Sequence, residues 1–357
     1  MIDKRYYFES NTKRRMVMKK KNGGWLVFFV LFSLVLAMAI SAQAQEKVLK
    51  LKYASLLPPV HPMSKMMEQW CKDVEQKTDG RVKVSYFPGN TLTPPTQTYD
   101  SVVNGIADIG YSLPAYSPGR FPLTEVLTLP LGFTSGSQAT TAINEYYKKF
   151  RPKEFDDTKV MYFMGSGPGL FFTRKPITSM DGIKGLRLKA NAENADIVKA
   201  LGGAPVTMPI TETYDALQKG LLEGVFSFYE VLKYWKFADV VKCCLENSAV
   251  AYTTSMYVVM NKDKWNLISK ADQQAIEKMN EETIEKSGKI WNELDKESKE
   301  YGIQKGVKIV KVSKEEEAST AEKMKPILAE YIKKMKAKGL PGEEAVKFLQ
   351  DYIKAHP

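Results

Sequence analysis

Two kinds of hydrophobic pattern follow one another along this chain, and they predict strands and helices in alternation. Short apolar or alternating runs predict strands at 48–53, 81–87, 108–113, 159–164 and 255–261. A second set of apolar residues recurs at spacings of 4, 3 and 4 and predicts a helix with one apolar face: Met63, Met67, Trp70 and Val74. A further helix is predicted over 99–106. This alternation indicates the α/β class.

The segment 181–237 shows the same alternation in a short space. Leu186 and Leu188 alternate with Arg187 and Lys189, which predicts a strand over 185–190 with both cations on one face. A helix is predicted over 194–201, a second one from Thr211 to the stop at Gly224, and a strand over 225–229. Lys189 falls at the carboxyl end of its strand, the edge where open α/β sheets bind ligands.

A long helix is predicted from about Ala271 to Glu300. Ser269 precedes it, and Asp272 follows three residues later as a capping pair. Its apolar stripe is narrow and comprises Ile276, Met279, Thr283, Ile290 and Leu294. The chain has no internal repeat and no low-complexity linker, so a boundary between two lobes must be a strand crossing, and this helix is expected to run along the outside of both lobes.

The amino end carries the pattern of a secretory signal peptide. Basic residues precede the apolar run from Trp25 to Ile40, and Ala42-Gln43-Ala44 follows as an A-x-A cleavage site. The apolar run has 16 residues, short of the ~20 that a bilayer span needs, so a retained anchor is the weaker alternative. We expect residues 1–44 to be removed, with Met16 or Met18 as an alternative start that would make the first residues an extension.

Charge and cysteine content narrow the class of partner. The net charge is +11, but residues 1–44 hold eight of the 52 basic and two of the 41 acidic residues, which leaves +5. Lysines and glutamates are interspersed, unlike the single-sign stripe of a nucleic-acid-binding surface, so no nucleic acid is expected. Cys71, Cys243 and Cys244 are expected to be buried thiols, with a disulfide from Cys71 to one of the pair as the alternative. No cysteine or histidine grouping suggests a metal.

The motifs that would indicate an enzyme are incomplete. Gly165-Ser166-Gly167-Pro168-Gly169 follows a strand, but Leu170 stands where a dinucleotide loop needs a glycine. His61 and His356 are the only histidines, and no G-x-S-x-G elbow is present. We therefore expect no catalytic residues, no cofactor and no enzymatic activity.

The run 181–224 resembles the solute-binding subunits of tripartite ATP-independent periplasmic (TRAP) transporters, the DctP-like family. The family pattern is a D-x-K-G-L-K-I-R strand, a K-A-L-G-A-x-P-V-P-M-P helix and crossing, and S-E-V-Y-x-A-L-Q-x-G-V-V-D-G. This chain has TETYDALQKGLLEG at the last of these, over 211–224, and further matches at 105–110 and 120–125. The resemblance covers nearly all of the chain after the signal peptide.

Two departures from the family pattern bear on the ligand. The arginine that clamps a substrate carboxylate is replaced by Lys189, which offers the same charge without the planar fork. The family's Q-E-N-P run is replaced by Val225-Phe226-Ser227-Phe228. An aromatic wall favours an aromatic or apolar-bodied monocarboxylate over a C4-dicarboxylate or 2-oxo acid, because ligand hydroxyls against phenyl rings lose hydrogen bonds. If Phe226 and Phe228 instead face the core, this preference disappears.

The resemblance implies a two-lobed periplasmic binding protein fold of type II, with strands that cross a hinge and a long helix that spans both lobes. Lobe I is expected to comprise 45–168 plus about 263–302, and lobe II 169–262 plus about 303–357. Lys189 would neutralise the ligand carboxylate, with Arg174 as the second candidate anchor. Hydrogen bonds and apolar contacts would come from Asn191, Ser112, Ser227, Tyr111, Phe171, Phe226, Phe228 and Tyr229. His61 would lie at the cleft edge, in contact with the ligand or only with its own turn.

The implied partners are an organic acid and the small and large integral membrane subunits of a TRAP transporter, for a monomeric receptor in the periplasm. Three rival functions are compatible with the same sequence. They are the receptor of an ATP-driven importer, a ligand sensor for a signalling kinase, and a secreted hydrolase or lyase.

Overall fold

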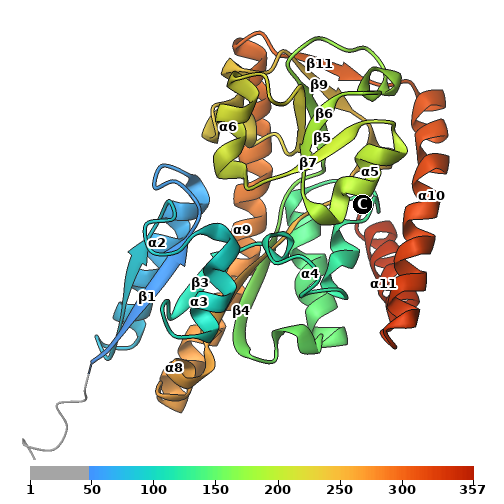
Figure 1. Ribbon diagram of the computed structural model, residues 1–357. Coiled ribbons are helices and arrows are strands. Elements are labelled where there is room, and N and C mark those ends of the chain that lie inside the picture. Colours follow the sequence, from blue (N-terminus) through green and yellow to red (C-terminus); the bar gives the residue numbers. More distant parts are fainter. Residues whose placement is uncertain (1–47) are drawn as a thin grey trace, which may run out of the picture. The chain divides into compact units, whose positions relative to one another are not determined.

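The computed structural model describes residues 48–357 and builds them on two β-sheets (Figure 1). The predicted signal peptide and its cleavage site lie outside the described residues. The first sheet has the order β2-β1-β3-β10-β4, in which β10 runs antiparallel to both of its neighbours. Its strands are β1 (Leu49–Ser55), β2 (Val82–Phe87), β3 (Ile109–Ser112), β4 (Thr158–Gly165) and β10 (Ser255–Asn261).

The second sheet has the order β11-β9-β5-β8-β6-β7. Here β5 is the antiparallel strand, between β8 and β9, whereas β6 is parallel to β7 and β8. The strands are β5 (Leu170–Thr173), β6 (Arg187–Ala190), β7 (Ala204–Thr207), β8 (Gly224–Ser227), β9 (Cys243–Glu246) and β11 (Lys308–Lys311). We name the parts built on the first and second sheets lobe I and lobe II. The predicted two-lobed α/β fold is confirmed.

Helices pack around both sheets. They are α2 (Pro62–Lys77), α3 (Thr98–Val103), α4 (Gly136–Phe150), α5 (Ala195–Ala200), α6 (Ile210–Gln218), α7 (Val231–Tyr234), α8 (Lys262–Asn266), α9 (Lys270–Gln304), α10 (Lys314–Ala337) and α11 (Gly342–Ala355). The predicted helix from Thr211 to Gly224 is shorter than expected. It ends at Gln218 because Gly220 adopts a left-handed φ of 73°, and Gly224 instead begins β8.

Two neighbouring segments carry the chain between the lobes. The first joins β4 to β5 through 166–169, and the second returns from β9 to β10 through 247–254. They are hydrogen-bonded to each other: Thr253 Oγ1 donates to the Ser166 carbonyl over 2.9 Å, and Gly169 N donates to the Tyr252 carbonyl over 2.9 Å. The glycine-rich 165–169 run therefore forms a crossing rather than a phosphate loop.

The return crossing corrects one part of the predicted lobe boundaries. The range 169–262 assigned β10 to lobe II, but β10 lies between β3 and β4 in the first sheet. Its seven residues are all buried, so the apolar run gave no sign of which sheet would accept it. The C-terminal segment also differs from the expectation, because α11 packs on α4 of lobe I and α10 contacts both α11 and α5 (Figure 1).

The long helix α9 joins the two lobes as predicted. It contacts α2, α4 and β4 of lobe I, and its last turns pack on α7 of lobe II, where Gly302 lies against Leu232. Ser269 Oγ accepts a hydrogen bond from Asp272 N over 3.1 Å, so the predicted cap is present. Among the described residues, no helix is long and apolar enough to cross a membrane.

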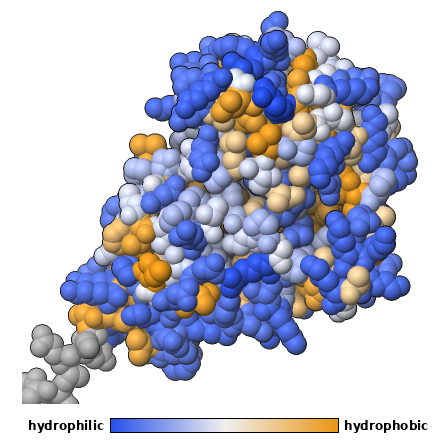
Figure 2. All heavy atoms as spheres, in the orientation of Figure 1, coloured by the Kyte–Doolittle hydropathy of each residue, from blue (hydrophilic) through white to orange (hydrophobic). Residues whose placement is uncertain are grey.

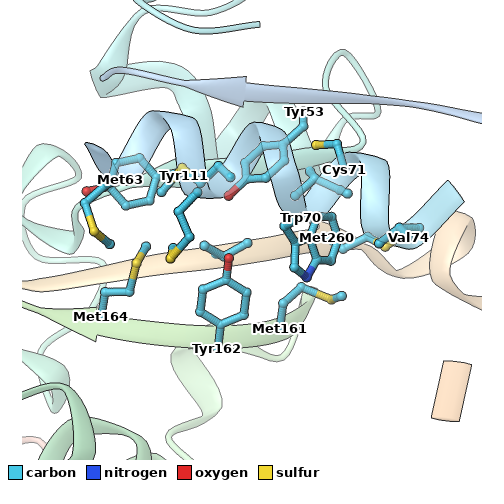
Figure 3. Packing of buried hydrophobic residues seen from close by; sticks show 14 of the residues in the cluster. Tyr53, Met63, Trp70, Cys71, Val74, Tyr111, Met161, Tyr162, Met164 and Met260 are labelled. Carbon is cyan, nitrogen blue, oxygen red and sulfur yellow. The ribbon is translucent and has the colours of Figure 1, made fainter. Parts of the chain in front are cut away.

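Apolar side chains fill both faces of each sheet. The predicted stripe of α2 packs between the first sheet and α9, with the Trp70 ring 6.0 Å from that of Tyr53 and with Met63 and Val74 at the two ends of the stripe (Figure 3). Cys71, Cys243 and Cys244 are buried free thiols, as predicted. Hydrophilic residues cover most of the face shown in Figure 2, and hydrophobic ones form scattered groups there.

The cap of α9 provides a test of this architecture. Ser269→Ala removes the oxygen that accepts from Asp272 N, and we expect the free energy of unfolding to fall by about 1 kcal/mol in urea denaturation. Ser269→Thr retains a capping oxygen and serves as the control. Equal stability of the alanine variant and the original protein would show that the cap contributes nothing.

Candidate functional site

A cavity lies between the two lobes, where the ends of strands from both sheets face each other. It is narrow, with a volume of about 50 Å³, below the ~300–1,000 Å³ typical of small-molecule sites. Tyr111 of β3 and Met256 of β10 line it from lobe I, and Lys189 of β6 and Ser227 of β8 line it from lobe II. The cavity is thus at the carboxyl ends of β3, β6 and β8, as expected for an α/β ligand site.

Lys189 provides a cation in the wall of this cavity. Its side chain is 3 % exposed, and Nζ donates to Asn191 Oδ1 over 2.7 Å. Asn191 is fixed in turn, because its backbone N–H donates to Asn194 Oδ1. Among residues 48–357, no carboxylate forms an ion pair with Lys189, whereas Arg187 on the same strand is exposed and paired with Glu223. The two cations of the strand therefore have different roles.

Burial controls the charge of Lys189. Desolvation lowers the pKa of its ammonium to about 8, although the charges of Glu193 and Glu230 oppose this shift. Burial also raises the pKa of the Glu193 carboxyl to about 7. A buried ammonium without an anionic partner favours an incoming anion, because a carboxylate would restore the charged form and complete its hydrogen bonds.

Aromatic rings form much of the remaining wall. Phe228 and Tyr252 pack together with ring centroids 5.2 Å apart, and Tyr116, Trp235 and Trp291 line the cavity beside them. The Tyr116 hydroxyl of lobe I accepts a hydrogen bond from Ile210 N of lobe II over 3.1 Å, which closes the cavity on one side. The space is therefore suited to a flat apolar body with a polar end.

The structure separates the two phenylalanines that the sequence placed on one face of a strand. Phe228 lines the cavity, whereas Phe226 is fully buried and stacks on Phe171 with centroids 4.2 Å apart and planes at 8°. The strand β8 ends at Ser227, so its period of two does not extend to Phe228. Phe171 and Phe226 belong to the core of lobe II, which corrects their prediction as cavity walls.

Four other predicted residues also lie away from the cavity wall. Ser112 Oγ donates to the Pro95 carbonyl over 2.9 Å, and the Tyr229 hydroxyl donates to the Glu246 carboxylate on the other side of the second sheet. His61 is fully buried as the N-cap of α2. Arg174 lies in a separate surface pocket with Glu223 and Lys242 and does not approach Lys189. Of the predicted site residues, Lys189, Asn191, Tyr111, Ser227 and Phe228 share the cavity.

The sequence interpretation missed several cavity residues, among them Glu230, Trp291 and Thr254. Each has a buried polar atom without a hydrogen-bond partner in the described part of the chain: Glu230 Oε2, Trp291 Nε1 and Thr254 Oγ1. Glu230 could have been noticed, since it is an acidic residue directly after the aromatic run 225–229 that the sequence predicts as a strand. Trp291 gave no such signal, because a tryptophan on a long helix is explained by ordinary packing. Residues 48–357 contain no grouping of three or more potential metal ligands.

Comparison with known proteins agrees with this geometry. The family model described as bacterial extracellular solute-binding protein, family 7 (DctP), matches residues 53–334. A TRAP periplasmic solute-binding protein from Desulfovibrio salexigens, solved in an open state, is 33 % identical with a TM-score of 0.76, covering 86 % of this chain and 96 % of its own.

Two further solved structures carry aromatic acids. A TRAP solute-binding protein from Rhodoferax ferrireducens in complex with benzoate is 25 % identical with a TM-score of 0.82, covering 87 % of this chain and 98 % of its own. A TRAP periplasmic solute-binding protein from Bordetella bronchiseptica with bound (R)- and (S)-mandelate is 27 % identical with a TM-score of 0.80, covering 87 % of this chain and all of its own. The chain therefore belongs to the DctP family of bacterial extracellular solute-binding proteins, as its resemblance to TRAP solute-binding subunits predicted.

Proposed function

We propose that this protein is the periplasmic receptor of a TRAP transporter and captures an aromatic or apolar-bodied monocarboxylate between its lobes. The observation that carries the proposal is the buried Lys189 ammonium, without an anionic partner among the described residues, in a cavity walled by aromatic rings. Lys189 neutralises the carboxylate, Asn191 holds the ammonium in place, and Phe228, Tyr252 and Trp235 enclose the ring of the ligand. Benzoate and mandelate in two family members support this ligand class.

We propose the remaining parts of the function from the family resemblance and from the sequence of the amino end. The receptor delivers its ligand to the small and large membrane subunits, acts in the periplasm as a monomer after cleavage near Ala44, and catalyses no reaction. A C4-dicarboxylate or 2-oxo acid is the second candidate ligand class, but one cavity cation satisfies only one carboxylate. A second ligand carboxylate would face Glu230 in the same cavity.

A ligand screen tests the proposal directly. The exported protein is assayed by thermal shift and titration calorimetry against benzoate, phenylacetate, succinate and 2-oxoglutarate. We expect stabilisation by the aromatic acids, by about 2.7 kcal/mol when a ligand is present at 100 times its dissociation constant. Stabilisation by the dicarboxylates alone would overturn the proposed ligand class.

Lys189→Met should weaken anion binding while it preserves the fold. Loss of a charge-assisted hydrogen bond weakens binding by about 1.5–3 kcal/mol, or roughly 10- to 150-fold. Unfolding experiments on the ligand-free variant provide the folding control. A pKa of about 8 in place of 10.5 means that the buried charge costs on the order of 3 kcal/mol at neutral pH, so the variant should be more stable by up to that amount. A variant that is stable and still binds with unchanged affinity would remove Lys189 from the site.

The affinity for an organic anion should fall as the pH rises above about 8. The free protein loses the Lys189 proton near that pH, whereas the bound carboxylate keeps the lysine charged, so binding at higher pH requires proton uptake. Calorimetry between pH 7 and 10 should show a loss approaching tenfold per pH unit. Lys189→Arg, which remains charged, is the control and should give a flat profile over this range. A flat profile for the original protein would contradict the mechanism.

Phe226→Leu and Phe228→Leu form a matched pair that separates the core from the cavity. Phe226→Leu disrupts the stack on Phe171 and should destabilise the fold by about 1–3 kcal/mol with little change in ligand preference. Phe228→Leu should instead weaken the binding of aromatic acids more than it affects the melting temperature. Equal effects of the two substitutions on binding would show that Phe228 has no separate role in the cavity.

A further inference from the structure

Glu230 places a carboxyl group in the wall of the cavity that we propose for an anion. Its side chain lines the cavity at 6 % exposure, and its Oε2 atom has no hydrogen-bond partner within residues 48–357. A ligand that offered only a carboxylate and an apolar ring would leave this acceptor buried and unpaired. Such an unpaired group costs free energy, so a ligand with a hydrogen-bond donor that reaches Glu230 should bind more tightly than one without it.

No group among the described residues lies within hydrogen-bond distance of Glu230 Oε2, which faces His61 Nε2 at 3.7 Å. Lys189 contributes a nearby positive charge, but its Nζ is hydrogen-bonded to Asn191 and forms no ion pair with Glu230 in the described chain. Asp295 on α9 is a second buried acid, and burial together with the charge of Glu230 raises the pKa of its carboxyl to about 8. Near pH 7 the Asp295 carboxyl is therefore mostly protonated and neutral, and it provides no counter-charge to Glu230.

His61 holds the position of Glu230 from behind. Its Nδ1 accepts a hydrogen bond from Met63 N over 3.2 Å, so the proton of the neutral ring lies on Nε2, the nitrogen that faces Glu230 Oε2 at 3.7 Å. The imidazole packs against Tyr234 with centroids 5.0 Å apart. Because His61 is fully buried and does not line the cavity, we treat it as a positioning residue.

We propose that Glu230 accepts a hydrogen bond from the ligand, so that the receptor favours aromatic acids that also carry a hydroxyl or amino donor. This inference rests on the proposed function, since it assumes that Lys189 binds the carboxylate of the same molecule. Lys189 lies on β6, and Glu230 immediately precedes α7, three residues after the adjacent parallel strand β8; both side chains line the same cavity, so one small ligand can reach both groups. A ligand donor that reaches a buried carboxylate raises the affinity by more than its buried surface area alone would, because an analogue without the donor leaves the acceptor unpaired.

Matched ligands test the donor requirement. The dissociation constants of phenylacetate, mandelate, 3-hydroxyphenylacetate, 3-aminophenylacetate and 3-methoxyphenylacetate are measured by calorimetry. At least one ligand with a donor should bind ten times or more tightly than phenylacetate, and the methoxy analogue, which has the bulk without the donor, should not. The best of the hydroxyl and amino ligands identifies the donor. If phenylacetate binds as tightly as every substituted acid, Glu230 has no such role although the proposed function stands.

Glu230→Leu provides the second arm of the test. Removal of the carboxyl should reverse the preference: phenylacetate should bind more tightly than to the original protein, and the favoured donor ligand more weakly. Glu230→Gln, which keeps the shape and an acceptor oxygen, should give an intermediate preference, and thermal unfolding establishes that both variants fold. A preference unchanged in both variants would overturn the inference. If no aromatic acid binds to the original protein, the proposed function itself fails.

Discussion

The structure of the cavity depends on the burial of one ammonium group at the end of β6. Burying Lys189 with no carboxylate in ion-pair contact among residues 48–357 is unfavourable, and the hydrogen bond from Nζ to Asn191 and the charges of Glu193 and Glu230 offset part of that cost. The remaining N–H groups of the ammonium have no acceptor among the described residues, and under the proposed function the ligand carboxylate accepts from them. A site of this kind binds its ligand more tightly, because the ligand completes hydrogen bonds that a buried group lacks in the ligand-free protein.

Under the proposed function, this constraint offers a way for a lysine to act where the family pattern has an arginine. Arginine stays charged when buried and recognises a carboxylate through two parallel hydrogen bonds. Lysine lacks that geometry, but the short contact with Asn191 restricts where Nζ can lie, so orientation is supplied by a neighbour instead of by the cation itself. In the same proposal the aromatic side chains Phe228, Tyr252 and Trp235 would disfavour a heavily hydroxylated ligand, because its hydroxyl groups would lose hydrogen bonds against the rings.

Sequence reasoning predicted the two lobes, the long helix and the position of Lys189 in the cavity wall, because each depends on a local pattern. Ser269 with Asp272 is a local signal for a helix start, and Lys189 at a strand end is a local signal for a ligand edge. It failed where the outcome depends on tertiary pairing. The apolar run of β10 could join either sheet, and only the crossing at 247–254 returns it to the first. Phe226 and Phe228 differ because β8 ends between them, and Trp291 reaches the cavity from a helix far away in the sequence.

The unsatisfied groups of the empty cavity also bear on how the lobes close. Lys189 and Glu230 belong to lobe II, whereas Trp291 of α9 and Thr254 of the crossing 247–254, which have unpaired polar atoms of their own within the described chain, line the same cavity. When the lobes close without a ligand, these polar atoms are buried without partners. The closed arrangement then gains only contacts such as the hydrogen bond from Ile210 N to the Tyr116 hydroxyl. A ligand that pairs with them stabilises only the closed arrangement. A ligand can shift the equilibrium between open and closed lobes only by the difference in its affinity for the two states. Its hydrogen bonds to these polar atoms would therefore provide the free energy of closure.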